Sequence, residues 1–151
     1  MTATIRILGI DPGLRHTGWG VVEQTGARLA HVAHGVISVN KDMEMAARLA
    51  GIFTAVAEIA RLHAPHAAGI EETLVNANPR SALKLGQARG AAMAALSLAS
   101  LPVAEFAPRK IKLAVVGTGT ADKDQVMFMV KRLLPRAGEM KADAADALAC
   151  A

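Results

Sequence analysis

The chain has 151 residues, of which 52% are hydrophobic and only 3% aromatic, and its formal net charge is +4. This length suits one domain with a single aliphatic core, and we expect residues 1–151 to form that domain. The apolar runs are interrupted by charges or glycine before they reach the length of a membrane span, so no membrane partner is expected. The N-terminal stretch reads as a first strand rather than as a signal or transit peptide. A single cysteine, Cys150, excludes an internal disulfide and favours a reducing compartment, with the cytoplasm as the default.

The positive charge is concentrated in one stretch of the chain. Between residues 76 and 123 there are seven lysines and arginines but only two acids. Such a surplus suits a nucleic-acid partner, although surface lysines often serve only solubility. Composition alone does not choose between these two explanations.

The first half of the chain predicts three strands, a helix and a fourth strand. The strands are expected at residues 4–10, 19–23, 29–37 and 67–70. The first stops at the turn that begins with Asp11, the fourth stops at Glu71, and Thr25-Gly26 forms a hairpin turn. Apolar residues between 49 and 60 repeat at helical spacing, and Asp42 is the expected N-cap of that helix.

The second half predicts four helices and one more strand. Asn78-Pro79 is a helix start, with asparagine as the cap and proline in the first position. A strand at residues 101–106 follows, Pro108 opens a short helix, and Asp122 with Gln125 forms a capping box for the next one. Residues 142–151 form a last, alanine-rich helix. The order β-β-β-α-β-α-β-α-α-α predicts an α/β fold in which a five-stranded mixed sheet carries helices on both faces.

Four carboxylates occupy positions where burial should disfavour them. Asp11 and Glu71 end apolar strands, while Asp143 and Asp146 lie three residues apart in the last helix and so project from one face. Each has an ordinary explanation, since an aspartate before Pro-Gly is often a turn former and the helical pair could face water. Two like charges in a partly buried site are nevertheless costly unless a cation neutralises them. A divalent metal ion would do so.

Strand geometry and the histidines narrow the choice of metal site. Neighbouring strand residues point to opposite faces, so only one of Glu71 and Glu72 can join Asp11, and periodicity does not say which. His31 and His34 are expected to face opposite ways in their strand, and no Cys/His cluster is apparent. Oxygen ligands alone favour Mg²⁺ or Mn²⁺ over Zn²⁺.

Four segments of the sequence resemble the RuvC-type crossover junction endodeoxyribonucleases, which are Holliday-junction resolvases. They are GIDPGLRHTGWGVV, GIEETLVNANPRSALKLGQARG, RKIKLAVVGTGTADKDQV and ADAADALA, in the order found in the family and over nearly the whole chain. The resemblance implies an RNase H-like fold, a homodimer, two Mg²⁺ ions per active site and four-way junction DNA as the substrate. It also implies a role in homologous recombination and DNA repair, where relatives cooperate with a branch-migration motor complex. Relatives usually continue beyond the point where this chain ends.

The resemblance assigns roles to individual residues. The metal-binding, catalytic carboxylates are Asp11, Glu71, Asp143 and Asp146. This assignment chooses Glu71 over Glu72. Lys112 and Lys123 match the family's basic residues near the scissile phosphate. Lys123 also lies in the first turn after the cap Asp122, where a cation opposes the helix dipole unless a DNA phosphate docks there.

Further DNA contacts are expected on the segment that follows the catalytic glutamate. Where some relatives carry a phenylalanine that wedges into the junction, this chain has Leu74, which can act as an apolar wedge but cannot stack as a ring does. The candidate backbone contacts are Asn76, Asn78, Arg80, Lys84 and Arg89. Phosphate contacts of this kind fix position rather than read sequence, and surface exposure alone would equally explain each of these residues.

The expected reaction is hydrolysis of one phosphodiester bond in each of two opposing strands. Two metal ions about 3.5–4 Å apart would straddle a phosphate and give 5′-phosphate and 3′-hydroxyl ends. A two-fold dimer would place two such sites on a two-fold junction. Gly86, Gly90 and Ala94 recur every four residues on one helix, where either a second protomer or the chain's own sheet could pack closely.

Other functions fit part of the same pattern. An actin-like or sugar-kinase-like ATP-binding domain opens with a similar strand and turn, but it needs a second related domain and does not explain the DAADALA segment. A junction-binding module without catalysis would explain the basic stretch but not the four acids. A general RNase H-like nuclease that cuts RNA–DNA hybrids would use the same fold and the same acids.

Overall fold

The computed structural model describes residues 3–72 and 78–151. In that part of the chain, five strands and five α-helices follow the order predicted from the sequence. The strands are β1 (Thr4–Asp11), β2 (His16–Thr25), β3 (Arg28–Ser38), β4 (Ala67–Glu71) and β5 (Val103–Phe106). The helices are α1 (Met45–His63), α2 (Pro79–Leu98), α3 (Pro108–Val116), α4 (Lys123–Leu133), the 3₁₀ helix η1 (Pro135–Ala137) and α5 (Ala142–Cys150). Among the described residues, no helix combines the length and the hydropathy needed to cross a bilayer.

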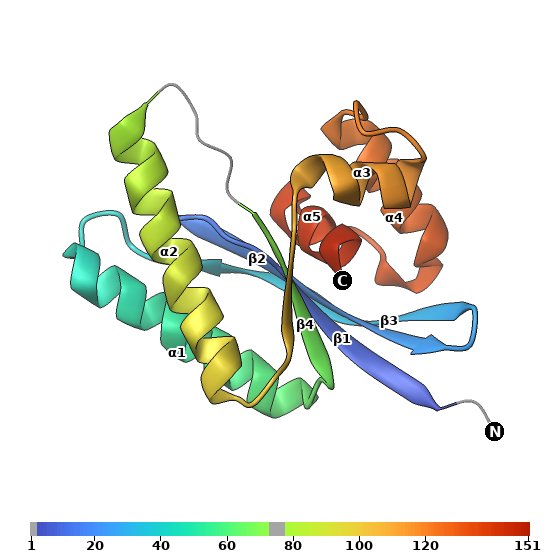
Figure 1. Ribbon diagram of the computed structural model, residues 1–151, viewed down its shortest axis with the longest axis horizontal. Helices are drawn as coiled ribbons and strands as arrows, with labels where there is room; N and C mark the ends of the chain where they lie inside the picture. The colour runs from blue at the N-terminus through green and yellow to red at the C-terminus, as the bar shows by residue number, and fades with distance from the viewer. Residues whose placement is uncertain (1–2, 73–77) are drawn as a thin grey trace.

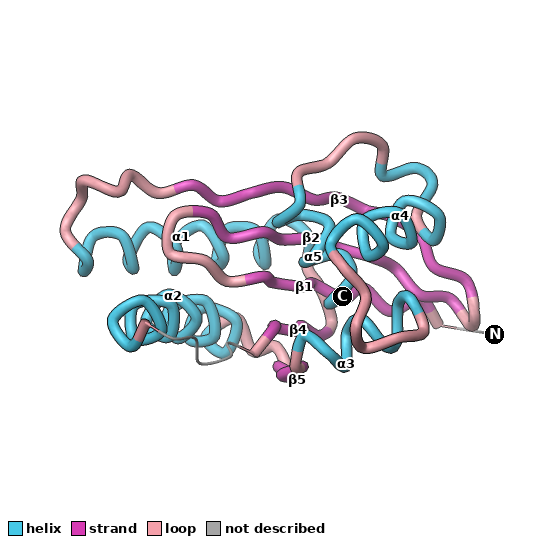
Figure 2. Tube along the Cα trace, turned by 90° about the horizontal axis from the view of Figure 1, so that it is seen from above, coloured by secondary structure: helices cyan, strands magenta, loops and turns pink. Residues whose placement is uncertain are grey.

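The strands form one mixed sheet in the order β3-β2-β1-β4-β5. The hairpin-linked strands β1, β2 and β3 are antiparallel, whereas β4 pairs in parallel with both β1 and β5. Figure 1 shows α1 and α2 on one side of the sheet and α3, α4 and α5 on the other. Seen from above in Figure 2, the strands lie beside one another in the same order. The predicted five-stranded mixed sheet with helices on both faces is therefore confirmed.

Alternation along the strands divides the hydrophobic core into two parts. Leu8, Ile10 and Ile70 are fully buried in the core that α1 and α2 cover. Val21 belongs to the same core, but its neighbour Val22 packs on the other side with residues of α4 and α5. Because successive strand residues point to opposite faces, β1 and β2 supply residues to both cores.

Helix starts agree with the sequence at two places and differ at one. The Asn78 side chain accepts hydrogen bonds from the N–H groups two and three residues later, at 3.1 and 3.3 Å. Asp122 and Gln125 form the predicted capping box, with two reciprocal bonds of 2.8 Å. The prediction that Asp42 caps the first helix is wrong, because α1 begins only at Met45 and has no side-chain cap. Asp42 lies in the turn that precedes this helix.

The prediction that His31 and His34 face opposite ways is also wrong. Val21 pairs with Ala33 whereas Val22 pairs with His31, so one residue of β3 is left over in the ladder. This extra residue is a β-bulge, and it reverses the alternation beyond it. As a result the Nε2 atom of His31 and the Nδ1 atom of His34 lie 2.8 Å apart.

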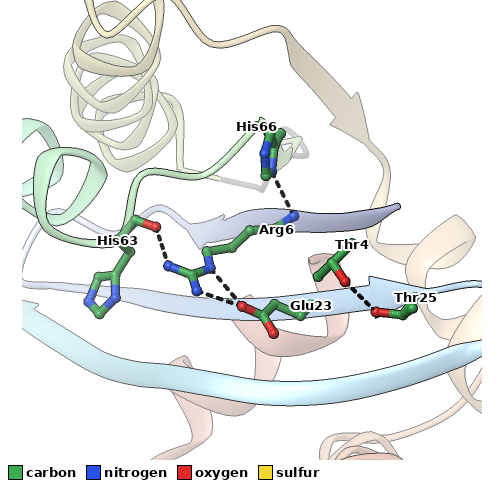
Figure 3. Close-up of polar contacts among 6 residues, drawn as sticks. All are labelled: Thr4, Arg6, Glu23, Thr25, His63 and His66. Atoms are coloured by element: carbon green, nitrogen blue, oxygen red, sulfur yellow. Dashed lines mark hydrogen bonds and ion pairs between the residues drawn. The ribbon is translucent and has the colours of Figure 1, made fainter. Parts of the chain in front are cut away.

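Arg6 joins β1 to β2 and to the end of α1 (Figure 3). Its guanidinium donates to Glu23 Oε1 at 2.5 and 3.1 Å and to the His63 carbonyl oxygen at 2.6 Å. Its backbone N–H donates to His66 Nδ1 at 2.9 Å. The His63 ring also contacts Trp19, with 5.4 Å between the ring centroids. These contacts fix the connection from α1 to β4, so that β4 enters the sheet beside β1.

Candidate active site

Asp11 and Glu71 end two neighbouring strands at the same edge of the sheet. β1 and β4 are parallel, and their last paired residues, Ile10 and Ile70, stand opposite each other. Since these isoleucines are buried on the α1–α2 side, alternation turns Asp11 and Glu71 to the other side, towards α5. The Glu71 carboxyl group lies close enough to that of Asp11 to raise the pKa of Asp11. Glu71 is therefore the glutamate that meets Asp11, and Glu72 is exposed.

The last helix, α5, approaches the sheet closely because glycines face it. A Cβ atom added at Gly18 would lie 1.9 Å from the carbonyl oxygen of Asp143, and one at Gly9 would lie 2.1 Å from that of Ala147. Gly20 faces the same helix. These distances are far below van der Waals contact, so a larger residue at either position would push α5 away. The strand glycines thus set the depth at which α5 carries its acids over the end of the sheet.

The acids of the sheet and of α5 form one electrostatic cluster. Burial raises the pKa of Asp11 to about 9, and the neighbouring Glu71, Asp146 and Asp143 contribute to the rise. Burial also raises the pKa of Asp146 to about 6, with Glu71 and Asp143 adding to it. Carboxylates influence one another in this way only at short range. The four predicted acids, from three separate segments of the chain, therefore lie together.

Lys112 and Lys123 belong to the same cluster. Lys112 is half-buried in α3, and Lys123 is the first residue of α4, directly after the cap. Both ammonium groups act to lower the pKa of Asp146, against the larger effect of burial. All six residues predicted to be catalytic are thus brought together from β1, β4, α3, α4 and α5.

The donor set of the cluster fits a divalent metal ion. Its acids supply only oxygen ligands, which Mg²⁺ and Mn²⁺ prefer. The raised pKa values of Asp11 and Asp146 reflect burial and a mutual repulsion that a cation would relieve. Within the described residues, no three Asp, Glu, His or Cys side chains already surround one ion position. Burial and the neighbouring Glu71 favour a proton on Asp11, and an ion bound there would displace that proton.

Cys150 lies next to the acids, although the sequence alone suggested no part for it there. It follows Asp146 by four residues and so lies on the same face of α5, as a buried free thiol. Burial raises the pKa of this thiol to about 12, and the neighbouring Glu71 and Asp11 add to the effect. A neutral thiol therefore packs beside the carboxylates. The four-residue spacing in DAADALAC was the signal that could have placed it.

The residues predicted to contact DNA differ in how exposed they are, and two of them lie outside the described residues. Asn78, Arg80 and Lys84 are exposed on the first half of α2. The predictions for Leu74 and Asn76 fall outside the described residues.

Arg89 is not exposed as its predicted DNA contact requires. Only 18% of its side chain is accessible. Its Nε atom donates to the Glu71 carbonyl oxygen at 3.2 Å, and one of its terminal nitrogens forms an ion pair with Glu105. The guanidinium of Arg89 is therefore occupied by contacts with Glu71 and Glu105 of the same chain.

Comparison with known proteins identifies the family. A family model described as crossover junction endodeoxyribonuclease RuvC matches residues 7–151. Proteins of the same description include one from Hyphomonas neptunium, 80% identical over 151 residues, which cover 100% of this chain and 90% of that protein. Another, from Rhodospirillum rubrum, is 55% identical over 147 residues, or 97% of this chain and 87% of the relative.

Solved structures agree with this result. The T. thermophilus RuvC protein in complex with a Holliday junction substrate matches with a TM-score of 0.90 and 32% identity, over 97% of this chain and 90% of that one. The yeast mitochondrial Holliday junction resolvase Ydc2 shares the fold at a TM-score of 0.69 and 14% identity, over 96% of this chain and 78% of that one. With its RNase H-like sheet and its match along almost the entire sequence, this chain belongs to the RuvC family of crossover junction endodeoxyribonucleases.

Proposed function

We propose that this chain resolves four-way (Holliday) DNA junctions by paired symmetric nicks, in homologous recombination and DNA repair. The observation that carries the proposal is the convergence of four acids and two lysines at one end of the sheet. The T. thermophilus relative, described in complex with a Holliday junction substrate, supplies the class of substrate. The proposed products are 5′-phosphate and 3′-hydroxyl ends. The proposed location is the cytoplasm, which suits the free thiol of Cys150.

Four carboxylates hold two Mg²⁺ ions in this proposal, and Mn²⁺ can replace them. Asp11 and Glu71 approach from the strand ends, while Asp143 and Asp146 approach from α5. Bound by these residues, such ions would supply an activated water for in-line attack and positive charge for the leaving 3′ oxygen. The carboxylates must be ionised to act as ligands, so metal binding releases the proton that burial and repulsion favour at Asp11.

Lys112 and Lys123 provide positive charge beside Asp146. Lys123 stands at the start of α4, where the helix dipole already favours an anion. Both ammonium groups are suited to contact the phosphate that is cut, and to stabilise the charge that develops on it. They also favour the ionised form of Asp146, which is the form that can bind metal.

The first half of α2 is the proposed guide for the DNA backbone. Its exposed side chains Asn78, Arg80 and Lys84 are suited to phosphate contacts, which fix the position of the duplex. Leu74 as an apolar wedge and Asn76 as a backbone contact belong to the same proposal.

A homodimer would place two sites on the two opposing strands of a junction. Gly86, Gly90 and Ala94 are all exposed, and a Cβ atom added at either glycine would meet no atom of the described residues within 4 Å. The stripe therefore does not pack on the described part of the sheet, and its surface is available to a second protomer. A branch-migration motor complex is the further partner in this proposal.

The test uses a synthetic four-way junction with each strand labelled in turn. The wild type should give paired symmetric nicks with Mg²⁺ and none with EDTA, while Asp11→Asn and Asp146→Asn should bind the junction without cutting it. Asp42→Asn, a matched change in an exposed turn, should cut like the wild type. Equal cutting of an RNA–DNA hybrid would instead favour a general nuclease. Junction binding without cutting by the wild type would favour a non-catalytic module.

A further inference from the structure

Arg89 on α2 reaches the end of β4. Its Nε atom donates to the Glu71 carbonyl oxygen at 3.2 Å, and a terminal nitrogen of the same guanidinium contacts the Glu105 carboxylate of β5. The arginine side chain is 18% exposed and the glutamate side chain 45%. One planar group thus connects three elements at the point where β4 ends.

Among residues 3–72 and 78–151, this end of β4 makes few other backbone hydrogen bonds. The pairing of β4 with β1 stops one residue before Glu71. On the other side Glu71 is in register with Phe106 of β5, and the next N–H, that of Glu72, donates to the Phe106 carbonyl oxygen at 2.8 Å. The hydrogen bond from Arg89 therefore adds a contact to the Glu71 carbonyl group that is independent of strand pairing, because it comes from a helix.

The guanidinium and the Glu71 carboxylate lie on opposite sides of the sheet. Ile70 is buried on the α1–α2 side, and its register partner in β5 is Glu105, which meets Arg89 of α2 on that side. By alternation the Glu71 side chain points the other way, to Asp11 and α5. Arg89 thus touches neither the carboxylate cluster nor the phosphate that would lie over it. It can act on Glu71 only through the backbone.

We infer that Arg89 is a positioning residue for Glu71, an inference that rests on the proposed metal-binding role of Glu71. By holding the carbonyl group, Arg89 sets the direction in which the Glu71 side chain leaves the strand, and so the place of its carboxylate beside Asp11. Glu105 orients the guanidinium and neutralises its charge, so this arginine offers little attraction to DNA. The role differs from the phosphate contact predicted from the sequence.

Arg89→Lys distinguishes the two roles. Lysine keeps the positive charge but cannot donate to two acceptors in the fixed geometry of the guanidinium. Positioning predicts that Arg89→Lys and Arg89→Gln both weaken Mg²⁺ binding about tenfold, the lower end of the effect of removing outer-shell partners of a metal site. Calorimetric titration with Mg²⁺ alone measures this without cleavage. Junction affinity in EDTA should stay within about twofold of the wild type, because no phosphate contact is lost.

Two further variants test the ion pair and the helix. Glu105→Gln should weaken Mg²⁺ binding less than Arg89→Gln, since the amide oxygen still accepts a hydrogen bond. The double variant should be no weaker than Arg89→Gln alone, because both changes remove one interaction. Lys84→Gln, a cation change on the same helix, should lower junction affinity and leave Mg²⁺ binding unchanged.

The possible outcomes separate this inference from the proposed function. Normal Mg²⁺ binding by Arg89→Lys and Glu105→Gln, together with loss of Mg²⁺ binding by Glu71→Gln, would overturn the positioning role alone. Normal Mg²⁺ binding by Glu71→Gln would overturn the metal-binding role on which it rests. Loss of junction affinity by Arg89→Gln, with normal affinity in Arg89→Lys, would instead support the phosphate contact predicted from the sequence. Glu105 is partly exposed, so Glu105→Gln tests the inference even where an arginine variant folds poorly.

Discussion

Asp11 and Glu71 bring their carboxyl groups together at the ends of two parallel strands, and Glu71 adds to the rise in the pKa of Asp11. Burial and this neighbour favour the protonated form of Asp11. The carboxylate of Asp11 that binds this proton is also proposed to bind Mg²⁺. Protons and divalent ions therefore compete for the site, and its response to pH should reveal the competition.

In EDTA, these acids should make the protein less stable as the pH rises. The pKa values of Asp11, about 9, and of Asp146, about 6, lie above the ordinary value of 3.8. Their stabilising contribution is complete below the ordinary value and is lost as the pH rises through about 6 and then about 9. Thermal melts between about pH 5 and 8.5 should therefore show a falling Tm. Mg²⁺ binds the ionised groups, so the rise in Tm that it causes should grow with pH.

Asp11→Asn is the control for this pH dependence. The amide carries no charge and can donate to Glu71, so the variant should melt at a higher temperature than the wild type in EDTA at about pH 8. It should also lose most of the response to Mg²⁺. A wild-type Tm that rises with pH in EDTA, or a Mg²⁺ effect that is equal at every pH, would contradict this account of the site.

Gly18→Ala should displace α5 from the sheet and with it the acids Asp143 and Asp146. The new Cβ atom would lie 1.9 Å from the Asp143 carbonyl oxygen, a backbone atom that cannot rotate away, so α5 must shift. Overpacking of this kind costs about 1–3 kcal/mol, and displacement of the acids should weaken Mg²⁺ binding. Urea denaturation and Mg²⁺ titration measure the two effects. At Gly51 a Cβ atom would meet only the end of the Val39 side chain, at 3.3 Å, so Gly51→Ala should be close to neutral. Equal behaviour of the two variants would argue against the close approach of α5.

The sequence was sufficient for the order of elements and for the expectation that acids stand at the ends of two strands. Apolar alternation marks the strands, and Asn78 and Asp122 mark helix starts through purely local hydrogen bonds. Asp11 and Glu71 meet because neighbouring parallel strands end at one edge of the sheet. Local pattern was enough for the order of elements, whereas the choice of Glu71 over Glu72 came from the family resemblance.

Features that depend on contacts between distant segments were not predicted. The depth of α5 depends on glycines from different strands that face one helix, although the spacing of Gly18 and Gly20 was a visible signal. The bulge that brings His31 to its partner histidine inserts one residue and leaves no clear mark in the sequence. Arg89 looked like a surface cation because only the packing of α2 on β5 brings Glu105 to it.

Arg6→Gln should destabilise the fold without altering the metal site. Its removal leaves the partly buried Glu23 and the His63 carbonyl group without their charged donor, at a cost of about 1–3 kcal/mol in the free energy of unfolding. The exposed pair of Arg61 with Glu58 offers a matched comparison, and Arg61→Gln should leave stability unchanged. Urea denaturation compares the two variants, and Mg²⁺ titration should match the wild type for both. An equal loss of stability in the two would mean that burial does not distinguish these ion pairs.

Gly90→Leu should separate the proposed homodimer while the protomer stays folded. In the part of the chain that the structure describes, a Cβ atom at this position meets nothing within 4 Å, and leucine favours a helix over glycine by roughly 1 kcal/mol, so circular dichroism should be retained. If a second helix packs on the stripe of Gly86, Gly90 and Ala94, the leucine side chain holds it away. Sedimentation at micromolar concentration should then give the mass of one chain, and the two nicks on a junction should lose their symmetry. Gln87→Leu adds the same side chain on another exposed face of α2 and should remain dimeric. A Gly90→Leu variant that stays dimeric and still makes paired nicks would show that the dimer interface lies elsewhere. A helix in contact with this stripe has no room for the added side chain.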